Sequence, residues 1–297
     1  MTILVTGATG SVGRLLVDEL VAAGAPVRAL TNNPARAALP EGVEVARGYL
    51  GKPSTLPAAL TGVETVYLAP LPGYVDDFVR CAREAGVRRV VVLSGEPAEY
   101  EAQGDPSTWH YYRIERAIEE GGFDWTFLRP GQFMNNTLDW APSIKAEGVV
   151  RAPYAGAVQT PIDLGDIAAV ARVVLLSERF GGQKITMSGP EGLTPPEEVE
   201  LIAAAIGRQV RFEEQTPQEY LDGLAPVIGL ETAQWLLDGF RMMAEHPMKP
   251  EPAVAELTGR PPVTYREWAV ANADAFRCVM SQDIGDTHGQ PRHLLGL

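Results

Sequence analysis

The chain has 297 residues, of which 45% are hydrophobic and 21% are charged. This balance is typical of globular proteins and unlike that of long disordered chains. The formal net charge of -13 argues against a dedicated nucleic-acid-binding protein, which would present a basic face. No stretch of the sequence approaches the roughly 18 apolar residues that a membrane span needs. The length allows one large α/β domain or two smaller ones.

The N-terminal residues and the cysteines indicate the cellular compartment. Residues 1–5 carry no basic region and run directly into a strand-like segment, so no signal peptide is expected. Cys81 and Cys278 lie far apart, which does not resemble a disulfide framework and fits a reducing cytosol. We therefore expect a cytoplasmic monomer or homodimer that binds a small-molecule substrate, with neither a nucleic acid nor a membrane as its partner.

Short apolar runs alternate with amphipathic stretches over the first ~130 residues, at the spacing of βαβ units. The predicted strands are Ile3–Val5, Val27–Leu30, Val43–Ala46, Thr65–Ala69, Arg89–Leu93 and Trp125–Leu128. The predicted helices between them are Ser11–Ala23, Pro53–Leu60, Tyr74–Ala85 and Trp109–Glu120. Nearly continuous apolar strands indicate a sheet that is covered on both faces. The sequence therefore predicts the α/β class, with a Rossmann-type doubly wound parallel sheet.

After this region the alternation of strands and helices breaks. A helix is predicted with Asp166 as its N-cap, and a strand over Lys184–Met187. A further helix is predicted to begin after Thr194, where Glu197 completes a capping-box pattern. From there to residue 276 the pattern is mostly helical, which indicates a smaller C-terminal lobe over the sheet's carboxyl edge. The predicted division is a Rossmann domain over 1–190 with a lobe insertion at about 131–160, a substrate-binding lobe over 191–276, and a tail over 277–297.

A glycine-rich loop joins the first predicted strand to the first helix, with glycines at the spacing G-x-x-G-x-x-G. Gly7 permits the tight turn, Gly10 lets backbone amides approach a pyrophosphate, and Gly13 lets the helix lie close to the strand. The free N–H groups of the helix N-terminus would face the phosphates. A glycine triplet alone can be a simple turn, but this one follows a strand and opens a helix, which favours nucleotide binding. The loop residues assigned to the cofactor are Gly7, Thr9, Gly10, Ser11, Val12 and Gly13.

The segment after the second strand indicates which dinucleotide is bound. An acid there would select NAD by accepting a hydrogen bond from the ribose 2′-hydroxyl, whereas an arginine would favour NADP. The segment has no acid, and Arg36 could reach a 2′-phosphate while Thr31 and Asn32 add hydrogen bonds. Alternatively, the Asn-Asn-Pro sequence merely begins a helix. The sequence favours NADP(H) and leaves NAD(H) open.

Three segments, Val5–Gly13, Val63–Leu68 and Asp124–Asn136, resemble the NmrA-like group of atypical short-chain dehydrogenases/reductases. Within that group the pattern is most similar to bacterial triphenylmethane and azo-dye reductases, and the resemblance covers about residues 1–275. It implies a Rossmann fold, an NAD(P) cofactor and reductase activity. The two best segments, the glycine loop and the Arg-Pro-Gly-x-Phe-Met-x-Asn stretch, are specific for the group and not for a substrate.

The sequence departs from the group's pattern at three places. Tyr49 follows Gly48 where an acid is common near the adenine, and Asn32 stands where NADP-using members often carry an arginine. Reductases of the isoflavone-reductase type carry a catalytic lysine twelve residues before the sixth strand, and Tyr111 occupies that position here. The Tyr-x-x-x-Lys pair of ordinary short-chain dehydrogenases is also absent, because Glu115 follows Tyr111 at that spacing.

The helix that carries this position supplies the candidate catalytic residues Tyr111, His110 and Tyr112. Without a neighbouring lysine, a tyrosine keeps a high pKa and can donate a hydrogen bond, but it is a poor base at neutral pH. We expect Tyr111 to face the nicotinamide, and His110 or Tyr112 to face the lobe or solvent, because consecutive helix positions are about 100° apart. Alternatively, all three are ordinary residues of an amphipathic helix.

Further residues are assigned to the cleft from their positions at strand ends or in the lobe. Leu68, Ala69 and Pro70 close the fourth strand and are assigned to the cofactor. Ser94, at the end of the fifth strand, occupies a place where short-chain dehydrogenases often carry a catalytic serine, although a backbone role near the nicotinamide is equally compatible. The residues assigned to the substrate are Phe133, Asn136, Trp235 and Met242. The histidines show no metal-ligand spacing, so no metal is expected.

These features favour an NAD(P)H-dependent oxidoreductase that transfers a hydride to a small, flat, apolar acceptor. A quinone, a dye, an enone or an aromatic polyketide-like molecule would suit it. The missing lysine leaves two alternatives open. One is a non-catalytic NAD(P)-sensing regulator of the NmrA type, and the other is a redox-silent isomerase or cyclase on the same fold.

Overall fold

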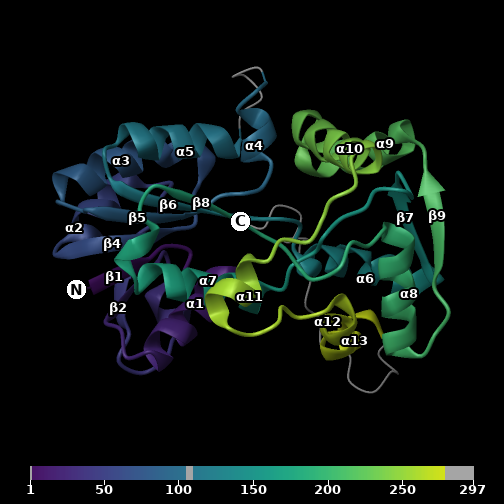
Figure 1. Cartoon of the computed structure of the whole chain (residues 1–297), viewed down its shortest axis with the longest axis horizontal. Helices are drawn as coiled ribbons and strands as arrows, with labels where there is room; N and C mark the ends of the chain where they lie inside the picture. The colour runs from purple at the N-terminus through teal and green to yellow at the C-terminus, as the bar shows by residue number, and fades with distance from the viewer. Residues whose placement is uncertain (1, 105–109, 278–297) are drawn as a thin grey trace.

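Seven parallel strands form the central sheet in the computed structural model of the chain, which describes residues 2–104 and 110–277 (Figure 1). Their order across the sheet is β3-β2-β1-β4-β5-β6-β8, so the direction of winding reverses between β1 and β4. The strands are β1 Thr2–Val5, β2 Val27–Thr31, β3 Glu44–Arg47, β4 Val63–Leu68, β5 Arg89–Leu93, β6 Asp124–Pro130 and β8 Gln183–Met187. The predicted class and topology are confirmed.

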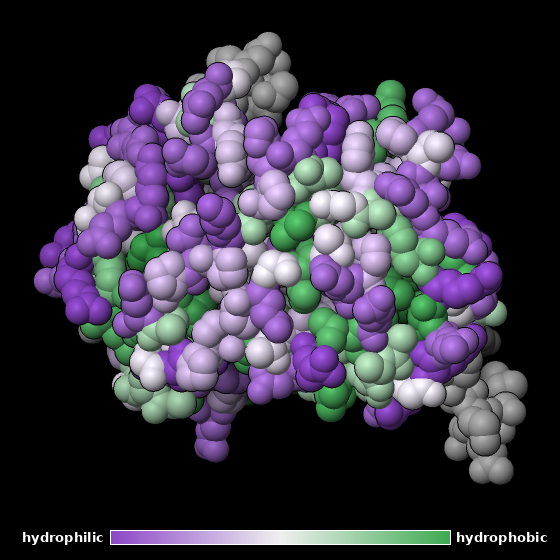
Figure 2. Space-filling model, turned by 45° about the vertical axis from the view of Figure 1, so that its right-hand side comes forward, coloured by the Kyte–Doolittle hydropathy of each residue, from purple (hydrophilic) through white to green (hydrophobic). Residues whose placement is uncertain are grey.

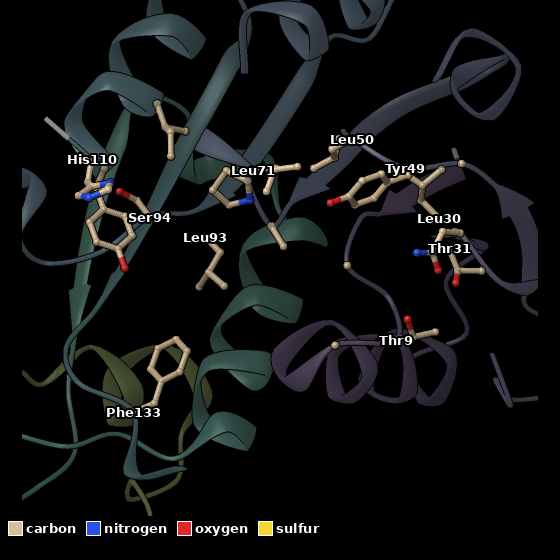
Figure 3. Close-up of a pocket in the computed structure, with 18 of the residues that line it drawn as sticks. Thr9, Leu30, Thr31, Tyr49, Leu50, Leu71, Leu93, Ser94, His110 and Phe133 are labelled. Carbon is tan, nitrogen blue, oxygen red and sulfur yellow. The ribbon is translucent and has the colours of Figure 1, made fainter. Parts of the chain in front are cut away.

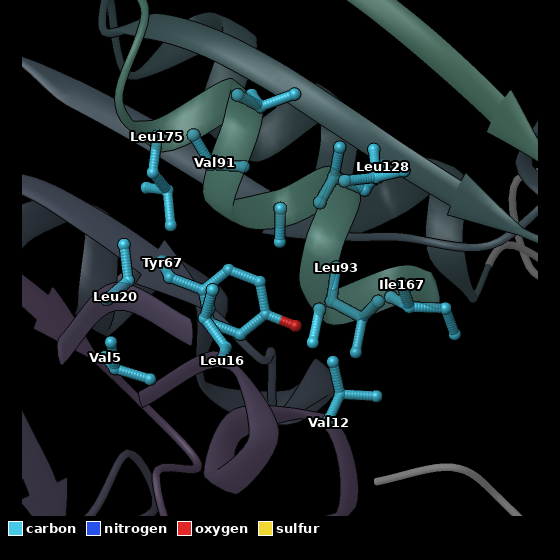
Figure 4. Close-up of a cluster of buried hydrophobic side chains, with 14 of the residues drawn as sticks. Val5, Val12, Leu16, Leu20, Tyr67, Val91, Leu93, Leu128, Ile167 and Leu175 are labelled. Atoms are coloured by element: carbon cyan, nitrogen blue, oxygen red, sulfur yellow. The ribbon is translucent and has the colours of Figure 1, made fainter. Parts of the chain in front are cut away.

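Helices cover both faces of this sheet, and five of them supply most of the helical residues in its two cores. These are α1 Ser11–Ala22, α2 Leu56–Leu60, α3 Val75–Glu84, α5 Tyr111–Glu120 and α7 Leu164–Leu175. The helices α1 and α7 pack on one face, while α2, α3 and α5 pack on the other (Figure 1). Figure 4 shows the first of these cores, in which the ring of Tyr67 lies among side chains of β1, α1, β5 and α7. Burial on both faces explains why the strands are almost continuously apolar.

The C-terminal part of the chain has a hydrophobic core of its own, to which Met134, Val150, Ile202, Tyr265 and Trp268 contribute. Its elements include a parallel strand pair that the sequence did not predict. They are α6 Ala141–Glu147, β7 Val149–Pro153, α8 Pro195–Ile206, β9 Arg211–Gln215, α9 Pro217–Ile228, α10 Leu230–Glu245, α12 Tyr265–Ala271 and α13 Ala273–Phe276. We call these elements the lobe. The helices α9 and α10 form a hairpin in which only Ala233 and Leu237 are buried.

The remaining elements are short. They are α4 Ala98–Glu101, α11 Ala253–Thr258 and the 3₁₀ turns Pro34–Arg36, Pro53–Thr55, Pro72–Tyr74, Met134–Trp140 and Glu178–Phe180. Helix α11 packs against α7, and Val254 joins the core on that face of the sheet. The chain therefore returns from the lobe to the sheet before it enters α12. The proposed domain boundaries stay a prediction. Figure 2 shows mostly hydrophilic residues on one face of the molecule, with hydrophobic ones gathered toward the middle and right of the view.

Two local predictions need correction. The N-cap of α7 is Asp163, whose carboxylate accepts a hydrogen bond from the Gly165 N–H at 2.7 Å, and not Asp166. Asp166 is buried in the first turn, where it accepts from the Val263 N–H and forms an ion pair with Arg260 at 2.6 Å. The helix predicted over residues 53–60 is a 3₁₀ turn followed by the short α2. The predicted start of α5 at Trp109 and most of the predicted tail lie outside the described residues.

The glycine loop determines how closely α1 approaches β1. Gly7 has a φ of +60°, in the left-handed region that glycine adopts most readily. A Cβ atom on Gly13 would lie only 2.2 Å from the Gly7 carbonyl oxygen. The first turn of α1 therefore packs directly on the loop backbone, and only a glycine at position 13 permits this contact.

We predict that Gly13→Ala lowers the free energy of unfolding by about 1–3 kcal/mol, because the added methyl group must displace the loop. Gly239→Ala is a matched control inside a helix, since a Cβ on Gly239 in α10 would meet nothing within 4 Å. It should be stabilising by about 0.4–1 kcal/mol. Urea unfolding followed by circular dichroism measures both variants. Equal effects of the two substitutions would contradict the packing role of Gly13.

Candidate functional site

A cavity of about 470 Å³ runs along the carboxyl edge of the sheet, where the loops after β1, β2, β3, β4 and β5 meet (Figure 3). Parallel sheets of this topology bind ligands at that edge, beside the point where the winding reverses. The lobe closes one end of the cavity through α10. The lining residues are Gly7, Thr9, Gly10, Leu30, Thr31, Asn32, Gly48, Tyr49, Leu50, Ala69, Pro70, Leu71, Leu93, Ser94, His110, Tyr111, Ile114, Phe133, Thr232 and Trp235.

The glycine loop forms one wall of the cavity. Gly10 is the N-cap residue of α1, and no side chain caps this helix. The N–H groups of the first turn are therefore left for an anion, as at other helix N-termini that bind phosphate. A Cβ on Gly10 would lie 3.2 Å from the Gly7 carbonyl oxygen, tighter than an ordinary contact. This arrangement fits the pyrophosphate of a dinucleotide.

The end of the cavity near β2 and β3 has the apolar and aromatic character that suits an adenine ring. Leu30 and Leu50 lie there beside Tyr49, whose phenol group points into the cavity in Figure 3. The Tyr49 ring packs over Gly51, where a Cβ would come within 2.4 Å of a ring carbon. Tyr49 is 48% exposed and lines the cavity, so part of its side chain is accessible to a ligand. A flat base could stack on it.

This end of the cavity contains no acid among the described lining residues. Thr31 lines it, and the Thr31 hydroxyl accepts a hydrogen bond from the Asn33 N–H at 3.2 Å. Arg36 does not line the cavity and lies exposed on the 3₁₀ turn after β2. Arg47 is the residue directly opposite Thr31 in the β2–β3 ladder, and it is also exposed. Neither arginine is among the residues that line the cavity.

The other end of the cavity is built on a buried ion pair that the sequence did not reveal. Ser94 donates its hydroxyl hydrogen to the Glu115 carboxylate at 2.6 Å. The same carboxylate accepts two hydrogen bonds from Arg129, at 2.9 and 2.7 Å. Arg129 also bonds Glu99 at 2.6 Å, and burial and these carboxylates act in opposite directions on its pKa, with a raised value as the result. Since the Ser94 hydrogen is already donated, Ser94 can act toward a ligand only as an acceptor.

Tyr111 lies at this end because the loop after β5 carries a glycine, Gly95, beneath the Tyr111 ring. A Cβ on Gly95 would come within 2.8 Å of the Tyr111 ring, so only a glycine leaves room for the ring there. Glu101 holds the start of α5, since its carboxylate accepts from the backbone N–H groups of His110 and Tyr112 at 3.1 and 2.8 Å. Burial, and then the charge of Glu101, raises the pKa of Tyr111 to about 12. Tyr111 is therefore a neutral hydrogen-bond donor.

Helix α10 of the lobe reaches this end through Trp235. The Trp235 ring meets the His110 ring edge-on at a centroid distance of 5.3 Å, and it lies 6.2 Å from the Tyr111 ring. Phe133, in the loop after β6, lines the cavity on the side opposite His110 in Figure 3. The cavity end is therefore an aromatic enclosure made by α5, α10 and the β6 loop.

The structure brings twelve of the residues assigned from sequence into this lining and leaves eight outside it. Those in the lining are Gly7, Thr9, Gly10, Thr31, Asn32, Ala69, Pro70, Ser94, His110, Tyr111, Phe133 and Trp235; those outside are Ser11, Val12, Gly13, Arg36, Leu68, Tyr112, Asn136 and Met242. Val12, Gly13 and Leu68 are buried beneath the cavity. The main residues that sequence reasoning missed are Gly95, Glu115 and Arg129. The only sequence signal for these three was that Glu115, an acid, stands where ordinary short-chain dehydrogenases carry the lysine of the Tyr-x-x-x-Lys pair.

No cluster of three or more histidine, cysteine or acidic side chains within residues 2–104 and 110–277 could hold a metal ion. In the same ranges, no helix is long and apolar enough to cross a membrane. Cys81 is a free, buried cysteine, and Cys278 lies outside the described residues.

Comparison with known proteins identifies the family. The model of the NmrA-like family matches residues 1–262, so this chain belongs to the NmrA-like family. It is 39% identical over 279 residues to the (4-alkanoyl-5-oxo-2,5-dihydrofuran-3-yl)methyl phosphate reductase of Streptomyces griseus, covering 92% of this chain and 99% of the relative. It is 33% identical over 288 residues to the NAD(P)H azoreductase of Xenophilus azovorans, with coverage of 92% and 99%.

A solved structure with the same fold is that of the NADPH-dependent quinone oxidoreductase QOR2 of Escherichia coli in complex with NADPH. Its TM-score is 0.77 at 22% sequence identity, and the match covers 91% of this chain and 99% of that chain. The predicted family and the Rossmann-like fold with a helical C-terminal region are thus confirmed. The relatives named here include an NAD(P)H azoreductase and an NADPH-dependent quinone oxidoreductase, two reductases that act on different substrates.

Proposed function

We propose that this chain is an NAD(P)H-dependent reductase that favours NADP(H) and transfers a hydride to a small, flat, apolar acceptor. The observation that carries the proposal is the single cavity that joins the glycine loop to the aromatic end at Tyr111 and Trp235. A dinucleotide held by the loop would extend to that end, where the lobe leaves apolar surface for an acceptor. The two curated relatives named above, both reductases, support the reaction class.

The residues present fit a dinucleotide. The uncapped N-terminus of α1 suits the pyrophosphate, Tyr49 suits the adenine, and Ser94 can accept a hydrogen bond at the far end. When bound in its reduced form, the cofactor supplies a hydride. The protein contributes binding, orientation and exclusion of water from the enclosed end.

Tyr111 acts in this proposal as a positioning donor. Its hydroxyl would hold an acceptor oxygen or nitrogen by a hydrogen bond worth about 0.5–1.5 kcal/mol net. It is not a base, because burial raises its pKa. The residue four positions later is Glu115, which is paired with Arg129, so no cation stands there to stabilise a tyrosinate. A lysine, which would stabilise a tyrosinate, is missing from the described part of α5. His110 also lines this end and could donate a hydrogen bond to the same acceptor.

The missing lysine is also the observation that favours the second candidate, a dinucleotide sensor without turnover. A sensor would need the cofactor site and no acid–base machinery. An isomerase or cyclase would use the cavity without net redox change.

We predict that the purified protein oxidises NADPH in the presence of at least one quinone, azo dye, triarylmethane dye or enone. The rate of NADPH oxidation is measured from the loss of absorbance of the reduced nicotinamide. Gly10→Val should abolish NADPH oxidation, because the valine side chain fills the place where a pyrophosphate must approach the loop. Tight NADPH binding with no turnover across the whole panel would favour the sensor instead, and unchanged dinucleotide binding in folded Gly10→Val would contradict the assignment of the loop.

Cofactor choice gives a second prediction, that NADPH binds more tightly than NADH. Arg36→Ala and Arg47→Ala remove the two guanidinium groups beside β2, and loss of a charged hydrogen bond worth about 1.5–3 kcal/mol would weaken NADPH binding roughly 10- to 100-fold. NADH binding should not change, since NADH lacks the 2′-phosphate. Titration calorimetry with both dinucleotides decides which arginine acts. A preference for NADH in the parent protein would contradict the prediction.

The third prediction concerns the helix at the aromatic end. Tyr111→Phe should lower kcat roughly tenfold, since loss of one hydrogen bond of about 1.4 kcal/mol corresponds to that factor. Because the pKa of Tyr111 is about 12, this residue should cause no fall in kcat as pH rises through the mildly alkaline range. Tyr112→Phe, outside the cavity lining, should have a smaller effect than His110→Ala, inside it. Unchanged kinetics in all three variants would make α5 a scaffold only.

A further inference from the structure

We propose that Thr232 of the lobe binds a neutral oxygen-bearing group of the acceptor, such as a hydroxyl or a carbonyl, away from the atom that receives the hydride. The contact would decide which acceptors the site prefers. This inference deepens the proposed reductase function and rests on it. It concerns a residue that the sequence pattern did not single out.

The lobe supplies two of the described lining residues, Thr232 and Trp235, and both come from α10. They are three positions apart, so their side chains lie on one face of the helix, about 4.5 Å apart along its axis. The buried residues of α10, Ala233 and Leu237, lie on another face. Helix α10 therefore packs through one face and presents Thr232 and Trp235 together to the cavity.

The hydroxyl group of Thr232 is accessible to a ligand. Within residues 2–104 and 110–277, no group forms a hydrogen bond with it, and its oxygen is not one of the unpartnered polar atoms that packing seals from solvent. A threonine hydroxyl can both donate and accept a hydrogen bond. Ser94 differs, because its hydrogen is already donated to Glu115. Thr232 thus adds to this end a hydroxyl with its full hydrogen-bonding capacity.

Trp235 sets the spacing between Thr232 and the reactive end. The Trp235 ring lies 6.2 Å from the Tyr111 ring and 5.3 Å from the His110 ring. Thr232 is one helical turn before Trp235. An acceptor ring that lies against Trp235 therefore meets the Tyr111 hydroxyl with its reacting group and Thr232 with a second group. Such an acceptor bridges α5 on the sheet and α10 on the lobe.

The charges around the aromatic end disfavour an anion as the partner of Thr232. The described lining residues include no lysine, arginine, aspartate or glutamate. Glu115 lies behind the lining, where it accepts from Ser94, and the nearby cation Arg129 is already bonded to it. An anion transferred here from water would lack a counter-charge, whereas a hydroxyl or carbonyl loses less on desolvation and regains a hydrogen bond. The second group of the acceptor is therefore neutral.

The test uses three naphthoquinones whose second ring carries hydrogen, a hydroxyl group or a sulfonate group. Their binding to the complex of the protein with oxidised NADP is measured by titration calorimetry, because no turnover occurs in that complex. We expect the parent protein to bind the hydroxyl-bearing quinone about 2- to 10-fold more tightly than the unsubstituted one, which corresponds to one hydrogen bond. The sulfonate should bind about tenfold more weakly than the unsubstituted quinone.

Three variants of Thr232 separate the effect of the hydroxyl from that of side-chain shape. Thr232→Val keeps the shape and should remove the preference for the hydroxyl-bearing quinone, whereas Thr232→Ser should retain it. Thr232→Lys places a cation at this position and should make the sulfonate the tightest of the three ligands. Gln234→Ala is the matched control, because Gln234 is an exposed residue of α10 outside the cavity lining, and it should change none of these affinities.

Turnover with NADPH gives an independent readout. A contact that is equally strong in the ground state and the transition state lowers KM without changing kcat. Thr232→Val should therefore raise the KM for the hydroxyl-bearing quinone about 2- to 10-fold at unchanged kcat. Both constants for the unsubstituted quinone, and the affinity for NADPH, should stay as in the parent protein. The midpoint of unfolding of each variant is measured in parallel.

Equal loss of affinity for all three quinones in Thr232→Val would overturn the proposal and make Thr232 part of the packing of α10. Loss of NADPH affinity alone would overturn it as well, because the hydroxyl would then belong to the cofactor site. A parent protein without the preference for the hydroxyl-bearing quinone, or a preference that survives in Thr232→Val, would also contradict it. If the preference depends on Thr232 but NADPH is not oxidised, the contact stands and the proposed reductase function has failed.

Discussion

The buried ion pair between Arg129 and Glu115 holds the reactive end of the site together. It joins β6 to α5, with two hydrogen bonds in the side-by-side geometry that is strongest for arginine and carboxylate. Through Glu115 it fixes the Ser94 hydroxyl, and through Glu99 it ties α4 to the sheet. Removal of one partner of such a pair typically costs about 3–5 kcal/mol, because a buried charge is left alone. The orientation of α5, and therefore of Tyr111, depends on this contact.

The same pair explains how the site differs electrostatically from that of a dehydrogenase with a tyrosine–lysine pair. A lysine beside a tyrosine would lower the tyrosine's pKa. Here the nearby cation is Arg129, and its guanidinium group is already bonded to the carboxylates of Glu115 and Glu99. Tyr111 consequently stays protonated. Tyr111 can therefore position an acceptor as a hydrogen-bond donor but cannot act as a base near neutral pH. An acceptor that is already electrophilic needs the least acid catalysis, so a site that works mainly by positioning suits it best.

The cavity is completed by contacts between residues far apart in the chain. The loops after five parallel strands meet at the carboxyl edge, because parallel strands all end on the same side. Helix α10 adds Thr232 and Trp235, and the contact of Trp235 with His110 joins the lobe to α5. The α9–α10 hairpin buries few of its own side chains, and the Val158 N–H also donates to the Met243 carbonyl at the end of α10.

The sequence by itself determined the features that depend on neighbours along the chain. The strand–glycine loop–helix unit from β1 to α1, the five following strands and the capping box at Thr194 all follow from local spacing, and the structure has them. The features that only the tertiary structure decided depend on contacts between residues that lie far apart in the sequence. Asp163 and Asp166 are equally good caps by type, and Arg260 and Val263, almost 100 residues later, draw Asp166 into the interior. The strand β9 has no apolar run, and only its pairing with β7 makes it a strand. The roles of Gly95 and Glu115 and the choice of Trp235 over Met242 likewise arise when separate elements pack. Local periodicity encodes which face of an element is buried, but not which residue of another element will meet it there.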